Sequence, residues 1–355
     1  MSRTTKLRFA CVQVNPRIGS VDANISKVRS LLKDVKEADF VILPELAITG
    51  YNFANKASIE PYLEEAEEGK GPSITLAKEI SNRLKCFTLI GYPEIFQSKI
   101  YNSAILISPA GEVLYNYRKT FLYETDETWG ASENPEKGFK SFNLVVDKEF
   151  YLSPSEKSYP TVKTNIGICM DLNPYKFEAP FNDFEFSLAA FAQRSKLILV
   201  PTAWLSPQSP SSNTLLSTEE KAKEGKAYEE LYFGEENSPI SSGVQFKGSE
   251  AVKPFDPSGF DASTINYWIL RFFPFLRHPN SIQDKYFEKA TVVMCNRVGV
   301  ENDIMYAGSS SIFQFLGKES ISNEIDSKNP SVNVIGSLGK GEVGVLIRDI
   351  DVEVD

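Results

Sequence analysis

The sequence predicts an α/β fold in which strands and helices alternate through the first half of the chain. Three observations support this prediction: short β-branched runs recur along the chain, amphipathic helical stretches separate several of them, and strands pair within Tyr101 to Tyr117. With 355 residues and 42% hydrophobic content, the chain can bury a large core in one large domain or two ordinary ones. We therefore expect layered α/β packing around a partly mixed sheet.

Strands are expected where short runs of apolar and β-branched residues occur, because such runs suit strands buried on at least one face. In order along the chain these runs are Leu7 to Val14, Phe40 to Leu43, Phe87 to Tyr92, Ala104 to Ser108, Val113 to Tyr117, Asn165 to Cys169, Leu197 to Val200, Thr291 to Cys295, Ser311 to Phe315 and Val343 to Ile347. The chain shows no internal repeat, so a repeat architecture is not expected.

Helices are expected in three stretches between these runs. The clearest is Asp22 to Val35, where Asp22 is a suitable N-cap. Its apolar residues recur at helical spacing: Ile25, Val28, Leu31, Leu32 and Val35. Ser73 to Leu84 and Phe184 to Gln193 show the same periodicity.

The segment from Ser206 to about Ser263 differs in composition, being rich in Ser, Pro, Glu, Lys and Gly. Its charged block E-E-K-A-K-E-G-K-A-Y-E-E is expected to form an exposed helix. Because strand-like sequence resumes afterwards, we interpret residues 206–290 as an insertion within a single domain spanning residues 1–355. The aromatic stretch 267–275 has two interpretations, core packing of the insertion or an apolar surface for a partner or membrane.

Composition excludes several classes of protein. A formal net charge of -9 and a pI near 5.0 argue against a nucleic-acid-binding protein, since nothing neutralises a row of phosphates. The four cysteines are scattered and never form C-x-x-C, which is typical of a reducing compartment. The N-terminal stretch lacks the apolar core of a secretory signal, and the apolar run Ile265 to Leu276 is shorter than the ~20 residues that span a bilayer. We expect a soluble, intracellular protein.

Most familiar catalytic arrangements are also unsupported. The only histidine, His278, is distant in sequence from every candidate nucleophile, so a Ser-His-Asp or Cys-His arrangement would rest on it alone. Neither G-x-S-x-G nor a P-loop occurs. A single histidine and dispersed cysteines leave no candidate ligand set for zinc.

The remaining candidate nucleophile is Cys169, in N-I-G-I-C-M-D at 165–171, where an expected strand gives way to a turn. Backbone amides after such a cysteine can point toward a developing oxyanion, and without histidine the base must be a carboxylate. Two other strands end in suitable residues, Glu45 after Pro44 and Lys119 in Y-N-Y-R-K-T. A partly buried glutamate can exchange protons with a thiol, while a lysine stabilises a thiolate and a tetrahedral oxyanion.

These three segments resemble, in order, the signature of the nitrilase (carbon-nitrogen hydrolase) superfamily: Glu after an apolar strand and Pro, Lys in an R-K pair, and Cys in G-I-C-x-D. Glu45, Lys119 and Cys169 are 74 and 50 residues apart, and the resemblance covers nearly the whole chain, being patchy only at 206–290. It implies a four-layer αββα sandwich with an insertion, in which these three residues are the catalytic triad.

Within the superfamily the sequence is similar to the fungal N-terminal amidases, on Y-R-K-T-F-L-Y-E-T at 117–125, G-I-C-M-D-L-N-P-Y-K-F at 167–177 and N-Y-W-I-L-R-F-F-P-F-L at 266–276. This resemblance implies deamidation of N-terminal Asn and Gln through a cysteine thioester, with release of ammonia and no metal or organic cofactor. The implied partners are protein or peptide N-termini and the downstream N-degron machinery. The implied compartment is the cytoplasm, with the nucleus and mitochondria as further candidates.

Further site residues follow from the same resemblance. Glu127, eight residues after Lys119, matches a second glutamate of some amidases and is expected to orient the lysine or hold the attacking water. Many superfamily members have arginine where this chain has Asn173, so substrates whose carboxylate that arginine reads are disfavoured. A substrate with an α-ammonium group would instead be bound by a carboxylate, and Asp171 is the nearest candidate in the sequence. Its side chain either faces the substrate or braces the turn.

The backbone amide of Met170 is expected in the oxyanion site, and Tyr51, Tyr175 and Trp204 are expected in the pocket. Two rival functions stay open at this point. One is a carbon-nitrogen hydrolase acting on small free amides, nitriles or ureido compounds, and the other is a catalytically silent binding protein on the same fold.

Overall fold

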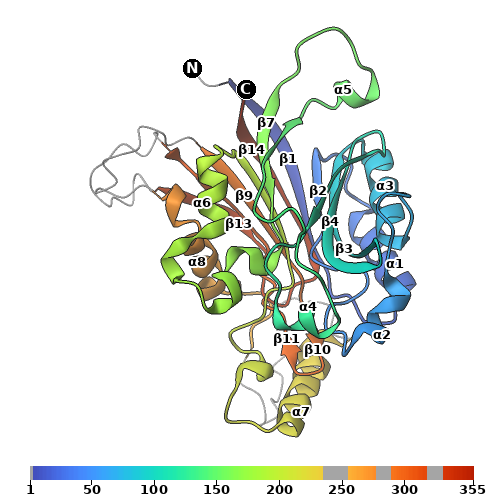
Figure 1. The fold of residues 1–355 in the computed structure, drawn as a ribbon, viewed down its shortest axis with the longest axis vertical. Helices are drawn as coiled ribbons and strands as arrows, with labels where there is room; N and C mark the ends of the chain where they lie inside the picture. The colour runs from blue at the N-terminus through green and yellow to red at the C-terminus, as the bar shows by residue number, and fades with distance from the viewer. Residues whose placement is uncertain (1–2, 235–254, 277–288, 318–330) are drawn as a thin grey trace.

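A computed structural model of the chain describes residues 3–234, 255–276, 289–317 and 331–355. His278 and parts of the 206–290 segment lie outside these ranges. In the described residues two six-stranded sheets run through the middle of the molecule (Figure 1).

The first sheet has the strand order β14-β1-β2-β3-β4-β5 and the second β13-β12-β9-β8-β7-β6. In each sheet three neighbouring strands run parallel, β1 to β3 and β7 to β9, and the outer strands pair antiparallel. The strand bounds are β1 Arg3–Gln13, β2 Phe40–Ile42, β3 Phe87–Phe96, β4 Lys99–Ile107, β5 Val113–Arg118, β6 Phe142–Val145, β7 Thr161–Ile166, β8 Leu197–Thr202, β9 Ala290–Asn296, β12 Ser311–Phe315, β13 Val332–Ser337 and β14 Gly344–Val354, with the short pair β10 Val300–Glu301 and β11 Ile304–Met305 apart from both sheets.

The helices cover the two outer faces of this pair of sheets (Figure 1). Helices α1 Val21–Leu32 and α3 Pro72–Leu84 pack on the first sheet, while α6 Glu185–Ala192 and α8 Ala262–Arg271 pack on the second. A separate core lies between the sheets. Phe9 and Phe40 of the first sheet and Leu199 and Val293 of the second belong to one cluster of buried hydrophobic residues. The order is therefore helix, sheet, sheet, helix, which confirms the expected four-layer αββα sandwich.

The sequence periodicity accounts for these layers. In α1 the buried residues Ile25, Val28 and Leu32 recur at intervals of three and four, and they meet the outer face of the first sheet. The expected N-cap, Asp22, lies instead in the first turn, since the helix begins at Val21 and Ser20 precedes it. The β3–β4 hairpin turns at Gln97 and Ser98, both with positive φ, as two-residue hairpin turns require.

Within the 206–290 segment, α7 Thr218–Tyr228 coincides with the expected charged helix and begins with a capping box from Ser217. The aromatic stretch mainly packs inward, because Trp268, Phe272 and Phe275 join the core over the second sheet. Three further short helices are α2 Lys56–Ile59, α4 Glu124–Thr128 and α5 Glu149–Leu152.

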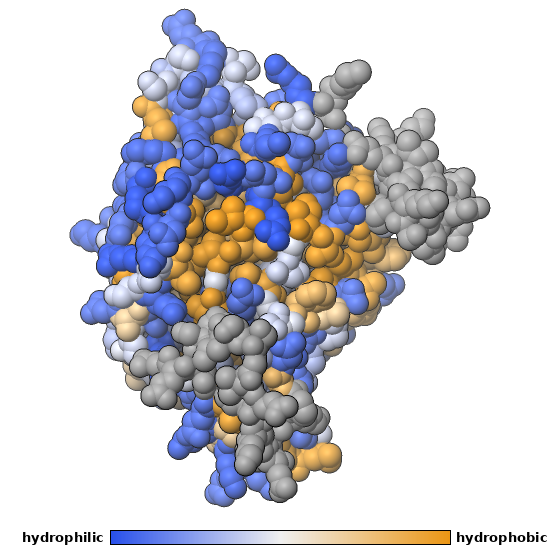
Figure 2. Space-filling view, turned by 180° about the vertical axis from the view of Figure 1, so that it is seen from behind, coloured by the Kyte–Doolittle hydropathy of each residue, from blue (hydrophilic) through white to orange (hydrophobic). Residues whose placement is uncertain are grey.

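The surface is mixed in character. Seen from behind, hydrophobic side chains gather in the middle of the molecule between hydrophilic ones (Figure 2). In the described ranges no helix combines the length and the apolar character that crossing a membrane would require.

Candidate active site

The three expected triad residues each follow the carboxyl end of a strand: Glu45 after β2, Lys119 after β5 and Cys169 after β7. In α/β proteins this is the edge at which ligands usually bind. Gly91 on β3 allows the chain carrying Glu45 to come close, because a Cβ atom there would lie 2.6 Å from the Glu45 Cα. The chain then turns sharply through Leu46, whose φ is 44°.

Glu45 is fully buried and makes polar contacts with three partners. Its Oε1 accepts hydrogen bonds from Asn102 Nδ2 and Lys119 Nζ, both at 2.7 Å. Its Oε2 accepts one from the backbone N–H of Ala203, at 2.6 Å, just past the end of β8. The carboxylate is thus fixed between the two sheets, with Lys119 on one side and the β8 end on the other.

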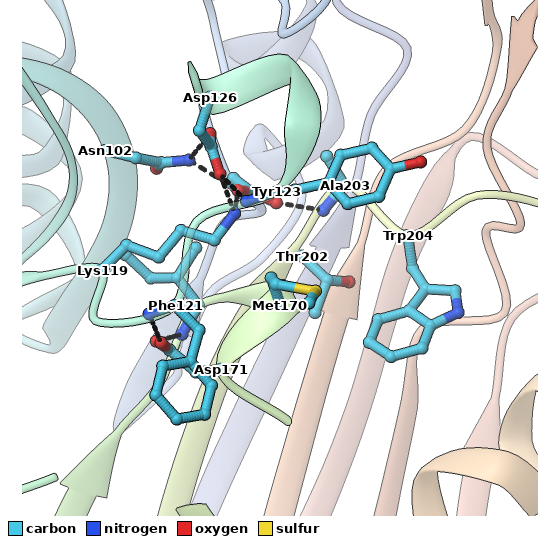
Figure 3. A network of polar contacts seen from close by, with 12 residues as sticks. Asn102, Lys119, Phe121, Tyr123, Asp126, Met170, Asp171, Thr202, Ala203 and Trp204 are labelled. Carbon is cyan, nitrogen blue, oxygen red and sulfur yellow. Dashed lines mark hydrogen bonds and ion pairs between the residues drawn. The ribbon is translucent and has the colours of Figure 1, made fainter. Parts of the chain in front are cut away.

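Lys119 is equally buried and contacts a second carboxylate, that of Asp126 on α4. The Lys119 Nζ lies 2.6 Å from Asp126 Oδ2, and Asn102 Nδ2 donates to Asp126 Oδ1 at 2.8 Å (Figure 3). The backbone N–H of Tyr123 also donates to Asp126, at 2.9 Å. Asp126 is therefore a second buried carboxylate that pairs with the Lys119 ammonium group, and Asn102 donates to both carboxylates.

The expectation that Glu127 orients Lys119 is corrected by this geometry. The Glu127 side chain is 54% exposed and pairs with Lys176 at 3.8 Å. Successive residues of a helix point about 100° apart, so a shift of one position moves a side chain from the inside to the outside. Asp126 takes the role that the spacing had suggested for Glu127.

Cys169 opens a single 3₁₀ turn, Cys169–Leu172, three residues after β7 ends. Its φ is 43°, an uncommon conformation for a residue with a side chain, and such outliers cluster at functional sites. The preceding Gly167 leaves room for Phe186, whose ring a Cβ atom would meet at 2.6 Å. Cys169 is 9% exposed and borders the cavity described below.

Asp171 braces this turn and does not line the cavity. Its Oδ1 accepts from the backbone N–H groups of Thr120 and Phe121, at 3.0 and 2.8 Å. Its Oδ2 accepts from the backbone N–H of Ile168 and the Tyr117 hydroxyl, each at 2.8 Å. The expected contact with a substrate α-ammonium is therefore corrected: four donors already use both oxygens, and they tie the Cys169 turn to the segment after Lys119.

Burial dominates the electrostatics of the cluster. Desolvation raises the pKa of Glu45 above its usual value, and the Asp126 charge adds to the rise while Lys119 opposes it. Desolvation also raises the pKa of the Cys169 thiol, with the Glu45 charge acting in the same direction. For Lys119, burial lowers the pKa, but Asp126 and Glu45 outweigh it, so the net shift is upward. A neutral thiol thus rests beside a protonated lysine and a carboxyl group that can exchange a proton.

A cavity of about 520 Å³ opens beside Cys169. Tyr51, Met170 and Trp204, all expected from the sequence, lie in its wall. The expected Tyr175 does not line it; its hydroxyl instead donates to Glu133 at 2.7 Å. The full lining is Tyr51, Tyr123, Cys169, Met170, Asn173, Phe177, Ala203, Trp204, Leu205, Ser206, Pro207, Ser212, Ser263, Thr264 and Tyr267. Among these described residues none is Asp, Glu, Lys, Arg or His, so the wall is aromatic and polar but uncharged.

Several lining residues were not expected from the sequence. Ser263, Thr264 and Tyr267 come from α8, in the 206–290 segment, and the Tyr267 hydroxyl donates to Asn173 Oδ1 at 2.7 Å. Ser263 and Thr264 carried no signal, because no periodicity identifies which loop or helix will meet a distant strand end, whereas Tyr267 lies in the 266–276 stretch that resembles the fungal amidases. Asn102, which donates to both Glu45 and Asp126, was not among the expected site residues either.

A metal centre has no candidate in the portion of the chain that the structure describes, since no group of three or more His, Cys, Asp or Glu side chains there is placed to hold an ion.

Comparison with known proteins places the chain in a family. The carbon-nitrogen hydrolase family matches residues 8–173. A relative from Saccharomyces cerevisiae is 35% identical over 98% of this chain and 96% of its own, and one from Schizosaccharomyces pombe is 32% identical over 94% and 100%. The chain belongs to the carbon-nitrogen hydrolase family.

The particular relatives are more informative than the family. Both yeast proteins are called protein N-terminal amidase. A crystal structure of N-terminal amidase with an Asn-Glu-Ala peptide superposes with a TM-score of 0.81 at 33% identity over 99% of both chains. A second one, with a Gln-Val peptide, has the same TM-score, identity and coverage.

Proposed function

We propose that this protein is an amidohydrolase that converts N-terminal Asn and Gln of proteins or peptides to Asp and Glu with release of ammonia. The observation that carries the proposal is the buried Glu45 and Lys119 pair, whose charges act on Cys169, together with the uncharged cavity that Cys169 borders. The names of the yeast relatives, and the Asn- and Gln-starting peptides in the solved amidase structures, support the same substrate class.

In the proposed mechanism Glu45 takes the proton of Cys169, and the thiolate attacks the carbon of the side-chain amide. Burial raises the pKa values of both groups, so Glu45 accepts a proton more readily than an exposed carboxylate, and the thiolate forms only as it attacks the amide. The thiolate forms the C–S bond as the amide C=O becomes an oxyanion. Lys119, kept protonated by Asp126 and Glu45, and the backbone amide of Met170 stabilise that negative charge.

The second half of the reaction reverses these proton movements. Glu45 returns its proton to the leaving nitrogen, the C–N bond breaks, and ammonia departs from the thioester. The same carboxylate then takes a proton from water, which attacks the thioester carbonyl and releases Cys169 as a thiol. Because the Glu45 carboxylate is fixed by Asn102 and Ala203 as well as by Lys119, one group can act in both halves without moving.

The uncharged wall favours a neutral side-chain amide over an acid. Burying an unpaired carboxylate is costly, whereas a neutral amide can form hydrogen bonds with the hydroxyl and amide groups of the wall. Asn173, where many relatives have arginine, fits this preference because its partner is the Tyr267 hydroxyl and no cation stands there. The rival substrates, small free amides and ureido compounds, share the neutral amide, and they differ in lacking a following peptide.

The test is ammonia release from short peptides that begin with Asn or Gln, compared with N-acetylated copies, free Asn and Gln, and carbamoyl compounds. We expect turnover of the free-amine peptides only, and loss of turnover in Cys169→Ala. The matched control is Cys86→Ala, which removes a buried thiol that hydrogen-bonds Thr88. Full activity of Cys169→Ala would exclude the mechanism, and turnover of small amides alone would reassign the substrate.

We also propose, from the resemblance to fungal amidases, that the new Asp and Glu N-termini pass to N-degron machinery in the cytoplasm. In cells lacking the enzyme, a reporter protein with an N-terminal Asn should become longer-lived, and a reporter with an N-terminal Asp should not. Equal lifetimes of the Asn reporter with and without the enzyme would contradict this.

A further inference from the structure

An aromatic surface starts at the mouth of the cavity and continues onto the outside of the molecule. Phe177 lines the cavity yet is 57% exposed, and Phe181 is 50% exposed. The ring of Phe181 lies 6.1 Å from that of Tyr267, a cavity residue, and 6.0 Å from that of Phe184. We call Phe177, Phe181 and Phe184 the aromatic rim.

The aromatic rim is held in place from beneath by Arg271 of α8. This side chain is 1% exposed, and its guanidinium carbon lies 4.8 Å from the Phe181 ring centroid and 5.0 Å from that of Phe184. It donates hydrogen bonds to the carbonyl of Phe181 and, at 2.7 Å, to the carbonyl of Leu172, the last residue of the Cys169 turn. The rim is therefore preorganised and connected to the nucleophile, which lowers the entropic cost of binding.

The backbone at Phe177 is strained in a way that keeps its ring at the mouth. Lys176 and Phe177 have φ values of 53° and 57°, a left-handed conformation that costs a residue with a side chain of this size about 1–3 kcal/mol. The Phe177 ring faces the edge of Tyr123, another cavity residue, with 6.3 Å between centroids. A large apolar side chain held in this state, half exposed beside Cys169, is placed to contact a ligand rather than the core.

The proposed function supplies that ligand, and the inference rests on it. When the first residue of a polypeptide reaches Cys169, the following residues must leave through the mouth and cross the rim. In an extended chain, side chains on one face recur every two residues, at about 6.7 Å. The ring spacings of 6.1 and 6.0 Å from Tyr267 to Phe181 to Phe184 come close to this repeat.

We propose that the aromatic rim binds apolar side chains of the substrate at alternate positions after its N-terminal Asn or Gln. The preferred substrates are then extended or unfolded polypeptides with apolar residues near the N-terminus, and the rim makes the enzyme distinguish them from equally long polar chains.

The test compares the hexapeptide Asn-Gly-Ser-Gly-Ser-Gly with five copies of it, each carrying one leucine at one of positions 2 to 6. Partial burial of one leucine on the rim should lower KM and so raise kcat/KM about tenfold. This gain should occur for leucine at two alternate positions of the peptide and not at the others. In Phe181→Ser the leucine peptides should lose this advantage, so that their kcat/KM is about equal to that of the polar peptide. The matched control is Phe150→Ser on α5, which removes a phenylalanine that is 41% exposed and lies outside the cavity wall, and it should keep the full advantage.

Three outcomes would overturn the inference: equal kcat/KM for polar and leucine peptides in the wild type, an unchanged advantage in Phe181→Ser, or the same loss in Phe150→Ser. Size-exclusion chromatography tests whether the rim instead joins two copies of the chain. In that case Phe181→Ser would dissociate a dimer and leave the advantage of the leucine peptides unchanged. Absence of turnover for every peptide would instead contradict the proposed function itself.

Discussion

Asp126→Asn probes the contact that the structure adds to the expected triad. Asp126 receives three hydrogen bonds, from Asn102 Nδ2, Lys119 Nζ and the Tyr123 N–H. An asparagine accepts with only one of its two terminal atoms, so its amide nitrogen must face one of these donors. Removing one partner of a buried ion pair costs about 3–5 kcal/mol, and because Lys119 keeps Glu45 at 2.7 Å we expect the lower end, about 3 kcal/mol of stability.

The same substitution should change the pH dependence of catalysis. The negative charge of Asp126 helps to raise the pKa of Glu45, so removing that charge lowers this pKa. Glu45 must be ionised to accept the Cys169 proton, and activity is therefore lost as the pH falls through its pKa. The acidic limb of kcat/KM should lie above pH 4.5, the ordinary value for glutamate, in the wild type, and move to lower pH in Asp126→Asn.

The assay is kcat/KM for an Asn-starting peptide across pH, together with urea unfolding of each variant. Glu127→Gln is the matched control, because that neighbouring side chain is 54% exposed and should change stability by no more than about 0.5 kcal/mol. Asp126→Asn should lower kcat/KM by about tenfold or more, which corresponds to about 1.4 kcal/mol. The reasoning is refuted if Glu127→Gln is the more damaging change, or if the acidic limb of Asp126→Asn stays in place or moves to higher pH.

Three further predictions follow from the buried carboxylates. Asp171→Asn should cost about 2–4 kcal/mol in urea unfolding with little change in KM, because four donors meet its oxygens; a large rise in KM at unchanged stability would restore the substrate contact. Burial raises the pKa of Asp171 from 3.8 to about 6, so between these pH values the native state holds a proton that the unfolded chain releases. The resulting stabilisation should fade as the pH rises from about 4 to 6 in the wild type but not in Asp171→Asn. Parallel stability curves for the two proteins would contradict this prediction. Glu301→Gln should cost about 3–5 kcal/mol by leaving the buried Arg297 guanidinium, 2.6 Å away, without a counter-charge, and an unchanged unfolding midpoint would count against this.

The strands of the sandwich were largely predictable from the sequence, whereas its arrangement was not. All ten expected runs overlap strands, because short apolar and β-branched runs suit strands that are buried on at least one face. Strands β6 and β13 were not expected, since each lies at the edge of its sheet and alternates buried and exposed residues weakly. The pairing of two sheets came only from the family resemblance, because periodicity reports which face is buried and not against which partner.

The site was predictable where chemistry and strand ends coincide. Glu45, Lys119 and Cys169 stand out because each follows an apolar run, and the structure brings Glu45 and Lys119 to 2.7 Å of one another. Asp126 was missed by one position, because spacing along the chain does not fix which side of a short helix faces inward. Asp171 was left with two interpretations, since only the fold shows that the donors of two separate segments converge on it.

The charges around Cys169 also bear on how the product leaves. The cluster contains two carboxylates, Glu45 and Asp126, and one ammonium group, Lys119, and the described cavity wall adds no cation. Deamidation turns a neutral side chain into a carboxylate within this environment, where it meets like charge and an incomplete set of partners. The site should therefore bind its product more weakly than its substrate.

We expect the inhibition constant of an Asp-starting peptide at neutral pH to exceed the KM of the matching Asn peptide by at least about tenfold, and to fall as the pH drops through the pKa of the new carboxyl group. Tighter binding of the product at neutral pH would mean that Lys119 serves the carboxylate directly, and the account of Lys119 as a cation already neutralised by Glu45 and Asp126 would be wrong.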